Sequence, residues 1–335
     1  MRPSLRALQS TINAASRPKT TGFIGLGRMG YQMAYNLFSK LHRQGDGSHF
    51  VVCDANPETA KLFCTNFMSA HPNAVIDFAE NPEHATMMSN RIVTMLPSSP
   101  EVKNVYSDFV IPALRKLSVS ASKETFFIDS TTLDVDIARE VASDVKQTGA
   151  QMIDAPVSGG VTGATAGTLS FLVGGTEEDF KLALPILTLM GQRIIHCGPS
   201  GAGLAAKICN NLILGVEQIV VAEAMLLGQR LGLNPAILAS VINSSTGACW
   251  SSFVNNPVPS ALPGKTPPCE RNYEGGFATS LMLKDMGLAS HTAQQRHSPL
   301  PLAEAAKDIY SRIVQERPEL SKKDFSSVYK FLEGQ

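Results

Sequence analysis

Apolar and polar residues follow two different patterns along this chain. Between residues 20 and 198, short apolar runs typical of buried strands alternate with stretches in which apolar residues recur at helical spacing. The first unit, residues 20–38, has an apolar run, a glycine-rich turn and then an apolar face of helical period. The later strand-and-turn stretches are residues 49–54, 91–99, 124–132, 151–160, 169–175 and 193–198. Strands that alternate with helices predict a parallel, doubly wound sheet.

From residue 199 onward the pattern is helical. Residues 203–233 form one apolar stretch without proline, so a helix here must be covered on most sides, and we expect it to span the join between two domains or an interface between subunits. The other helical stretches are 234–245, 279–296, 301–316 and 325–334, with a proline-rich loop at 255–276. We therefore predict an α/β fold: a Rossmann-type, dinucleotide-binding, doubly wound parallel sheet over residues 20–198, joined by the long helix to an all-α C-terminal domain, residues 199–335.

Length and charge narrow the function classes. A chain of 335 residues is long enough for two domains that each bury a core. Lys plus Arg and Asp plus Glu both number 29, so no net field favours nucleic acid or an anionic membrane as a partner. Polar residues interrupt the longest apolar runs, and we expect none of them to span a bilayer. These features favour chemistry on a small molecule.

Two features bear on the compartment. The six cysteines form no CxxC pair and have no histidine at ligand spacing, so we expect no metal site, no disulfide framework and a reducing compartment. Residues 1–19 contain four basic residues and no acidic one, a composition typical of a mitochondrial transit peptide with a mature start near residues 18–20. A basic leader without an address is the alternative.

A GxGxxG motif lies between the first strand and the first helix of the predicted sheet. Its residues are Gly25, Leu26, Gly27, Arg28, Met29 and Gly30. Such glycines permit a tight turn whose N–H groups meet a pyrophosphate at the positive end of a helix. Asp54 ends the second strand, 24 residues after Gly30, where a carboxylate accepts hydrogen bonds from ribose hydroxyls and repels a 2′-phosphate. The motif therefore predicts NAD rather than NADP as the cofactor; a glycine-rich turn near a surface aspartate is the structural alternative.

The turn at residues 155–160 carries a second candidate site. Ser158, Gly159 and Gly160 follow a predicted strand, and glycines leave backbone N–H groups uncovered. Such a nest, with the serine hydroxyl beside it, suits the carboxylate of a small acid. An ordinary turn is an equally good interpretation of these residues taken alone.

Lys207 and Asn211 are four residues apart in the long apolar helix, so they lie on one face and can converge on one ligand. A lysine that extends its ammonium into water is the commoner case. The amide at helical spacing favours a different hypothesis, in which Lys207 exchanges a proton with a substrate hydroxyl and burial lowers its pKa.

Two further pairs remain open at this point. Lys284 and Asp285 are neighbours in an apolar helix, where a surface ion pair is the default and a lysine that closes over the cofactor is the alternative. Trp250 and Phe253 lie in a loop between helices, where they either cap an apolar part of the substrate or pack locally.

Together these motifs resemble those of the β-hydroxyacid dehydrogenase family. The matching stretches, in family order from residue 21 to the end, are GFIGLGRMG, TMLPSS, FIDSTT, DAPVSGGVTGATAGTLSFLVGG, GAGLAAKICNN, GACWSS, NYEGGFATSLMLKDMGLA and SKKDFSSVYKFL. The sequence departs from the family pattern in a longer loop at residues 41–48 and an enlarged stretch at residues 260–273.

The resemblance implies roles for individual residues. Lys207 matches the catalytic lysine of the family and Asn211 its supporting amide, while Ser158, Gly159 and Gly160 match its substrate-carboxylate loop. Asp54 matches the acid that selects NAD. The positions that match other cofactor contacts are Leu96, Pro97, Thr132 and Lys284.

The implied reaction is NAD-dependent oxidation of a short β-hydroxy acid, 3-hydroxyisobutyrate, to methylmalonate semialdehyde in valine breakdown, in the mitochondrial matrix and without a metal. One alternative is a sibling enzyme acting on glyoxylate, succinic semialdehyde or tartronate semialdehyde. Another is a dehydrogenase fold retired from catalysis and used as an interaction module, which the retained Lys207 and the neutral charge disfavour. The long apolar helix leaves surface for a partner subunit, so we expect a homodimer or homotetramer.

Overall fold

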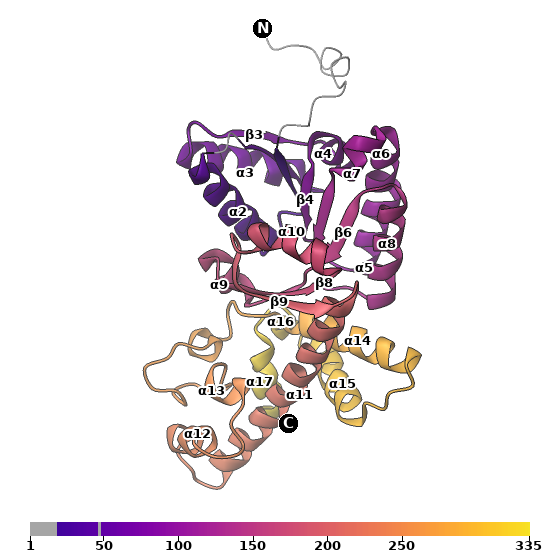
Figure 1. Ribbon diagram of the computed structural model, residues 1–335. Coiled ribbons are helices and arrows are strands. Elements are labelled where there is room, and N and C mark those ends of the chain that lie inside the picture. Colours follow the sequence, from indigo (N-terminus) through magenta and orange to yellow (C-terminus); the bar gives the residue numbers. More distant parts are fainter. Residues whose placement is uncertain (1–18, 46–47) are drawn as a thin grey trace.

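The structure is a computed structural model that describes residues 19–45 and 48–335. The predicted transit peptide, apart from its last residue, lies outside this part. A sheet region lies above a helical region in Figure 1, and α11 runs down from the junction between them. The strands are β1 Thr20–Ile24, β2 His49–Cys53, β3 Val75–Phe78, β4 Arg91–Thr94, β5 Phe126–Asp129, β6 Gln151–Asp154, β7 Val157–Ser158, β8 Leu169–Gly174 and β9 Gly191–Gly198.

The strands form one sheet in the order β3-β2-β1-β4-β5-β6-β8-β7, with β9 paired to β8. From β3 to β6 all neighbours are parallel, which confirms the doubly wound prediction. Beyond β6 the sheet is mixed, because β8 runs antiparallel to β6 and β7 and parallel to β9. The expected single strand at residues 151–160 is divided into β6 and β7 by Ala155 and Pro156, and proline cannot donate to a sheet ladder.

The register brings the carboxyl ends of the central strands together. Ile24 pairs with Cys53 on one side and with Thr94 on the other, and Asp129 pairs with Thr94 and with Asp154. The turns that follow β1, β2, β4, β5 and β6 therefore meet at one edge, which we call the carboxyl edge. In a doubly wound sheet this edge is the usual ligand-binding position.

Helices cover both faces of the sheet, and two separate apolar clusters lie beneath them. Phe23, Phe38 and Phe50 belong to one cluster, and Ile24, Tyr106 and Phe127 to the other. The helical elements of this region are α2 Gly30–Gln44, α3 Pro57–Ala70, α4 Pro82–Met88, α5 Ser99–Val105, η1 Tyr106–Val110, α6 Ile111–Lys116, α7 Val119–Lys123, α8 Val135–Gln147, α9 Gly160–Ala166 and α10 Glu177–Leu187.

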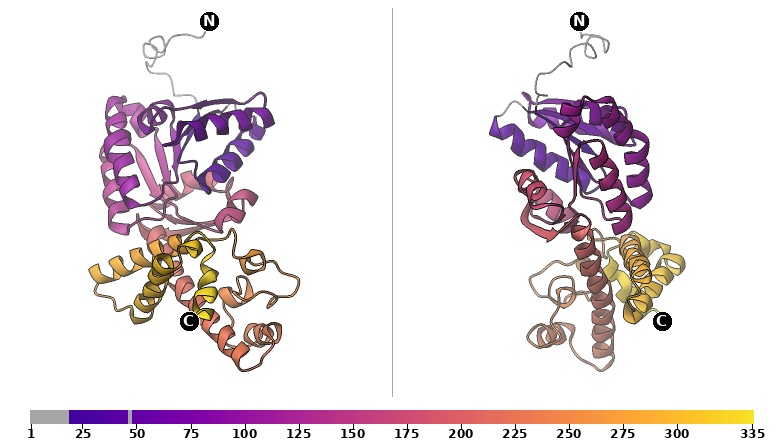
Figure 2. Two further views of the ribbon diagram at one scale, coloured as in Figure 1. Left: turned by 180° about the vertical axis from the view of Figure 1, so that it is seen from behind. Right: turned by 45° about the vertical axis from the view of Figure 1, so that its right-hand side comes forward.

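The C-terminal region is all helical and packs around a third apolar cluster. Both views in Figure 2 place it below the sheet region. Its elements are α11 Ala202–Arg230, α12 Pro235–Asn243, α13 Trp250–Phe253, η2 Pro268–Arg271, α14 Thr279–Gln295, α15 Pro301–Glu316, α16 Pro318–Ser321, η3 Phe325–Ser327 and α17 Val328–Glu333. The expected helix at residues 325–334 begins as a 3-10 turn, since Asp324 caps it through the N–H of Ser326.

The long helix α11 joins the two regions, as predicted. Leu204 and Ile208 pack in a cluster of the sheet region, whereas Ile219 and Met225 pack in the helical cluster. By length and composition alone α11 could cross a membrane, so its polar residues interrupt the apolar run less than we expected. In the fold it is the central helix, and it buries polar side chains such as Gln218 among its neighbours.

Candidate active site

The glycine turn after β1 is shaped by close backbone approach. Gly25 has φ +96°, and a Cβ there would collide with the Met95 carbonyl oxygen. A Cβ at Gly30 would collide with the carbonyl oxygen of Gly25. A Cβ at Gly27 would meet nothing within 4 Å. The outer two glycines are therefore required by the fold, while the middle one keeps the approach to the turn open.

Asp54 is tied to this turn. Its Oδ2 accepts a hydrogen bond from the N–H of Leu26 at 2.7 Å, and its Oδ1 accepts one from the N–H of Asn56 at 2.9 Å. The first turn of the adjacent helix α2 lies in the described part of the chain. It has neither a side-chain cap nor an acidic residue. A positive helix end and a fixed carboxylate thus lie on neighbouring turns.

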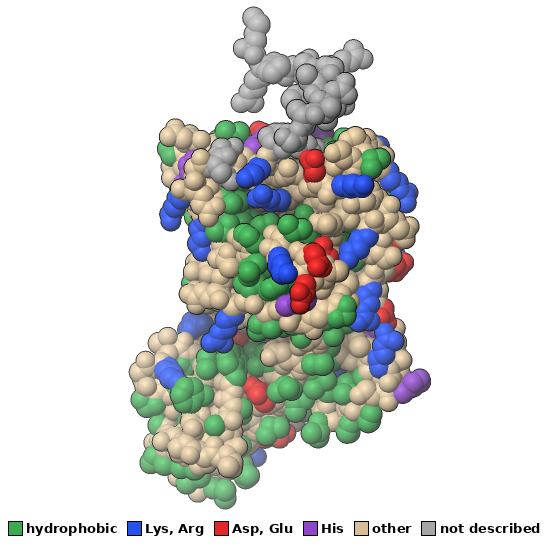
Figure 3. All heavy atoms as spheres, in the orientation of Figure 1, with side chains coloured by type: hydrophobic (Ala, Val, Ile, Leu, Met, Phe, Trp, Pro, Cys, Tyr) green, Lys and Arg blue, Asp and Glu red, His purple; other side chains and the backbone are tan. Residues whose placement is uncertain are grey.

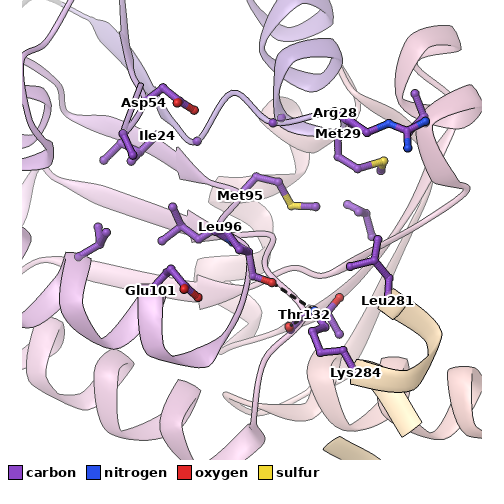
Figure 4. A pocket seen from close by; sticks show the side chains of 18 of the residues that line it. Ile24, Arg28, Met29, Asp54, Met95, Leu96, Glu101, Thr132, Leu281 and Lys284 are labelled. Carbon is purple, nitrogen blue, oxygen red and sulfur yellow. Dashed lines mark hydrogen bonds between the residues drawn. The ribbon is translucent and has the colours of Figure 1, made fainter. Parts of the chain in front are cut away.

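A cavity of about 720 Å³ opens along the carboxyl edge and against the helical region. Figure 4 shows Asp54 at one end of it and Thr132 with Lys284 at the other. Most of the predicted site residues line it: Gly25, Gly27, Arg28, Met29, Gly30, Asp54, Leu96, Pro97, Thr132, Ser158, Gly159, Gly160, Lys207 and Lys284. Two do not, since Leu26 and Asn211 are buried behind the wall.

The turns after β4 and β5 are held together by a buried hydroxyl. Thr131 Oγ1 donates to Asp129 Oδ1 at 2.7 Å and accepts a hydrogen bond from the N–H of Leu96 at 2.9 Å. Burial raises the pKa of Asp129 to about 6, an effect that the hydrogen bonds from Thr131 and Thr94 oppose. Leu96 and Thr132 thereby keep fixed positions on the cavity wall.

The loop at residues 158–160 is a glycine turn between β7 and α9. Gly159 and Gly160 have φ of +131° and +60°, both in the region that favours glycine. Helix α9 begins at Gly160, and Ser158 lies at the end of β7. Successive backbone N–H groups in such a turn can converge on a carboxylate.

Lys207 lines the cavity from helix α11 and is 8% exposed. Its ammonium makes no hydrogen bond to another group among the residues that the structure describes. Burial lowers its pKa from the ordinary value; the nearby Asp285 carboxylate raises it, and Lys284 lowers it. The expectation of a buried lysine with a lowered pKa is therefore confirmed, and a snorkelling surface lysine is excluded.

Asn211 acts on Asp285 and does not face the cavity. Its Nδ2 donates to Asp285 Oδ2 at 2.6 Å. Asp285 is 3% exposed, so the default of a surface ion pair with Lys284 is wrong. Lys284 Nζ lies 3.6 Å from Asp285 Oδ1 and donates to the carbonyl oxygens of Pro97 and Thr132, at 3.3 and 3.1 Å. Lys284 thus links α14 to the two turns of the carboxyl edge.

Trp250 and Phe253 are not among the residues that line this cavity. Their side chains are about half exposed, Trp250 stacks on Phe325 with centroids 6.5 Å apart, and Lys265 lies over the Phe253 ring. Local packing is therefore the correct interpretation. Of the enlarged stretch and the rest of the loop at residues 255–276, only Gly276 reaches the cavity.

Sequence reasoning missed several lining residues. Asp285, Glu80, Glu101 and the wall formed by Gly276, Phe277 and Ala278 all line the cavity. Asp285 had a local signal, because an aspartate beside a lysine in an apolar helix requires a partner. Glu101 lies in α5 and the others lie in or next to turns, and the approach of all of them to the cavity depends on long-range packing.

The residues of the carboxyl edge fit a nicotinamide dinucleotide. The open position at Gly27, the uncapped start of α2 and the fixed Asp54 carboxylate suit a pyrophosphate beside a ribose diol. Ser158 and Lys207 line the same cavity, so a small second ligand can share it with the dinucleotide.

Comparison with known proteins agrees with this geometry. Residues 20–198 match a family model described as the NAD-binding domain of 6-phosphogluconate dehydrogenase, and residues 201–332 match one described as NAD-binding of NADP-dependent 3-hydroxyisobutyrate dehydrogenase. The chain is 41% identical over 331 residues to the mitochondrial 3-hydroxyisobutyrate dehydrogenase of Bos taurus, an alignment that covers 98% of this chain and 92% of the relative.

A second relative and a solved structure extend the match. A probable mitochondrial 3-hydroxyisobutyrate dehydrogenase of Dictyostelium discoideum is 41% identical, with 95% of this chain and 92% of the relative covered. The structure of the Mycobacterium tuberculosis 3-hydroxyisobutyrate dehydrogenase with L-serine superimposes with a TM-score of 0.81 at 38% identity, covering 94% and 99% of the two chains. The chain therefore belongs to the 3-hydroxyisobutyrate dehydrogenase family and is an oxidoreductase that uses a nicotinamide dinucleotide.

Proposed function

We propose that this protein oxidises 3-hydroxyisobutyrate to methylmalonate semialdehyde with NAD⁺, and that Lys207 accepts the hydroxyl proton. The single observation that carries the assignment of Lys207 is a buried amine, with no protein hydrogen-bond partner among the described residues, in the wall of the cavity that fits the cofactor. A lysine buried without a partner gains one when a substrate hydroxyl binds beside it.

The roles of the other residues follow from their positions. The nest at Ser158, Gly159 and Gly160 binds the substrate carboxylate and so orients the other end of the molecule towards Lys207. The hydroxyl proton passes to the neutral amine of Lys207, and a nicotinamide held at the carboxyl edge would supply the acceptor for the hydride that leaves C3. The ammonium formed then stabilises the oxygen, on which negative charge develops. Asn211 acts through Asp285, whose charge favours this protonated form.

Cofactor choice rests on Asp54 in this proposal. Its carboxylate is fixed by the Leu26 and Asn56 N–H groups and lines the cavity where an adenosine ribose fits. A ribose diol can donate to it, whereas a 2′-phosphate is repelled. Leu96, Pro97, Thr132 and Lys284 are the contacts proposed for the nicotinamide half.

The test is a spectrophotometric assay of the full chain with 3-hydroxyisobutyrate, comparing NAD⁺ with NADP⁺, with Lys207→Ala alongside. We expect turnover that prefers NAD⁺ and is lost in Lys207→Ala. Activity on a different hydroxy acid only would move the protein to a sibling substrate, and equal activity of Lys207→Ala would contradict the role of the lysine.

We further propose that the protein works in the mitochondrial matrix. Relatives from cattle and Dictyostelium are named mitochondrial, and the basic composition of residues 1–19 supports a transit peptide. The proposed mature chain then has a dinucleotide-binding domain at residues 20–198 and a helical domain at residues 199–335. A fusion of residues 1–19 to a fluorescent protein should enter mitochondria; a cytosolic fusion protein would contradict the address.

A homodimer or homotetramer is supported by the surface of α11. Ile213, Val220 and Leu227 are seven residues apart and 61%, 55% and 60% exposed, so they form one apolar stripe. Ile213 and Val220 also line a groove between α11 and residues 299–303, which is mostly apolar with Glu217 in its wall. Figure 3 shows hydrophobic side chains over the helical region. Sedimentation should give a dimer or tetramer that Val220→Glu dissociates; a monomeric wild type would contradict this.

A further inference from the structure

Asp324 lies in the SKKDFSS stretch, one of the stretches that resemble the family. Its carboxylate is 2% exposed and is fully engaged by neighbouring groups. Oδ1 accepts hydrogen bonds from Asn255 Nδ2 and from the N–H of Ser326, both at 3.0 Å, and Oδ2 accepts one from the N–H of Phe277 at 2.8 Å. A buried carboxylate that holds three separate donors fixes their relative positions.

One of those donors belongs to the wall of the active-site cavity. Gly276, Phe277 and Ala278 line the same cavity as Lys207. Backbone hydrogen bonds join this wall to the segment around Asp324, from Phe325 N–H to the Phe277 carbonyl at 2.8 Å and from Thr279 N–H to the Lys323 carbonyl at 2.9 Å. Ala278 and Asp324 also form an isolated antiparallel bridge. The wall is therefore one side of a short ladder whose other side is residues 323–325.

The packing between the two sides is close. Gly276 has φ +64°, and a Cβ there would collide with the Asp324 carboxylate. The ring of Phe277 meets the ring of Phe325 edge to face, with centroids 6.1 Å apart. A shift of Asp324 must consequently move the wall, because no slack separates them.

We propose that Asp324 is a positioning residue for the reaction, which holds the wall formed by Gly276, Phe277 and Ala278 in the place where it fits the carbon skeleton of the substrate. The inference rests on the proposed function for its substrate. Asp324 has no contact with the cavity itself, so its influence passes through the N–H of Phe277 and the adjoining ladder.

The test is Asp324→Asn. An amide has one oxygen, so it loses either the bond from Phe277 or those from Asn255 and Ser326. We expect the KM for 3-hydroxyisobutyrate to rise about tenfold, as the loss of one hydrogen bond to a charged group permits. The preference over 3-hydroxypropionate, which lacks the methyl group, should fall. The KM for NAD⁺ should change less than that for the hydroxy acid, because most of the proposed cofactor contacts lie in turns of the sheet region and Lys284 alone lies on α14.

The matched control is Tyr310→Phe. Its hydroxyl donates to the Gly215 carbonyl at 2.9 Å, also buried in the helical region but away from the cavity, so its removal should lower stability without changing either KM. Should Asp324→Asn fail to fold, Thr279→Val leaves the Asp324 carboxylate intact. It removes the hydroxyl bonds to the Lys323 carbonyl, the Asp324 carbonyl and Ser327 Oγ, at 3.2, 3.5 and 3.3 Å, and should raise the substrate KM by a smaller factor.

Amide hydrogen exchange of residues 273–279 gives a readout that does not depend on turnover. We expect the Phe277 amide to exchange faster in Asp324→Asn and at the wild-type rate in Tyr310→Phe. An unchanged exchange rate, or an unchanged substrate KM and preference in the folded variant, would overturn the inference. A wild-type protein inactive on 3-hydroxyisobutyrate would count against the proposed function alone.

Discussion

Asp154 and Lys207 are both buried ionisable residues at the junction of the two regions, yet their surroundings differ. Asp154 is 5% exposed, and its two oxygens accept hydrogen bonds from the N–H groups of Gly201 and Leu204, at 2.7 and 3.0 Å, at the start of α11. Lys207, one turn further along the same helix, has no hydrogen-bond partner in the described part of the chain. The Asp154 carboxylate, which holds the start of α11, has its hydrogen-bond partners within the protein. The Lys207 amine is left for a ligand.

The glycines around Asp154 support this contrast. A Cβ at Gly174 or at Gly203 would run into its carboxylate. Burial raises the pKa of Asp154, and the bonds from Gly201 and Leu204 oppose the rise. An aspartate at a helix N-terminus also interacts favourably with the helix dipole. The role of Asp154 is therefore to anchor α11 and so to set the position of Lys207.

The largest expected effect comes from Lys207→Met. It should lower kcat by about a thousandfold, the usual range for a lost acid–base group. The free energy of unfolding should stay the same or rise. The folded pKa lies below the unfolded one, so the charged lysine destabilises the fold at neutral pH, and an apolar side chain removes that cost. Steady-state kinetics and urea unfolding measure the two quantities. A clear loss of stability would contradict the contrast drawn between Lys207 and Asp154.

Asp154→Ala should instead lower the stability of the fold. It leaves the Gly201 and Leu204 donors without acceptors, so we expect the free energy of unfolding to fall by about 3 kcal/mol. Asp154→Asn, which keeps one acceptor, is the matched control and should lose less. Urea unfolding of both variants decides the matter, and a stability equal to the wild type in Asp154→Ala would show that the anchor is dispensable.

Asp54→Ser tests the other end of the cavity. There the carboxylate accepts hydrogen bonds from protein N–H groups and, as proposed, from the ribose of the cofactor. The ratio of kcat/KM for NAD⁺ to that for NADP⁺ should fall by about tenfold to a hundredfold, because the repulsion of a 2′-phosphate is removed. The KM for the hydroxy acid should not change. An unaltered cofactor ratio would mean that another group selects the ribose.

The smallest effect is expected from Asp285→Asn, which keeps an acceptor for Asn211 but removes the charge near Lys207. Since the Asp285 carboxylate raises the pKa of Lys207, its neutralisation should lower that pKa further. Oxidation needs the neutral amine, so the rising limb of the kcat/KM profile against pH should move to lower pH. A shift to higher pH would contradict the assignment of Lys207 as the group that titrates.

Features that depend on local sequence could be predicted. The glycine turn and Asp54 required only a strand, a turn and a helix, and the structure places them on one cavity. The burial of Lys207 was inferred from the amide of Asn211 at helical spacing, because apolar neighbours alone also suit a lysine that extends into water. The partner of Asn211 did not follow, because Asp285 is 74 residues away and their contact depends on how α11 and α14 cross.

The same dependence on contacts between distant parts of the chain explains the other differences between prediction and structure. The reversed direction of β8 depends on pairing across the sheet, and the cavity wall at Phe277 depends on a ladder with residues 323–325. Asp154 stands in a recognised motif, yet its acceptor role requires the start of α11, 47 residues later, to lie against it. Long-range contacts of this kind leave no periodic signal in the sequence.

The most direct test of the central claim is chemical rescue of Lys207→Ala by small alkylamines. An amine that enters the space left by the side chain can accept the hydroxyl proton in its place. We expect NAD⁺-dependent oxidation of 3-hydroxyisobutyrate to be lost in Lys207→Ala, to return with ethylamine in proportion to the free-base concentration, and not to respond to ethylamine in the wild type. Full activity of Lys207→Ala without added amine would contradict it.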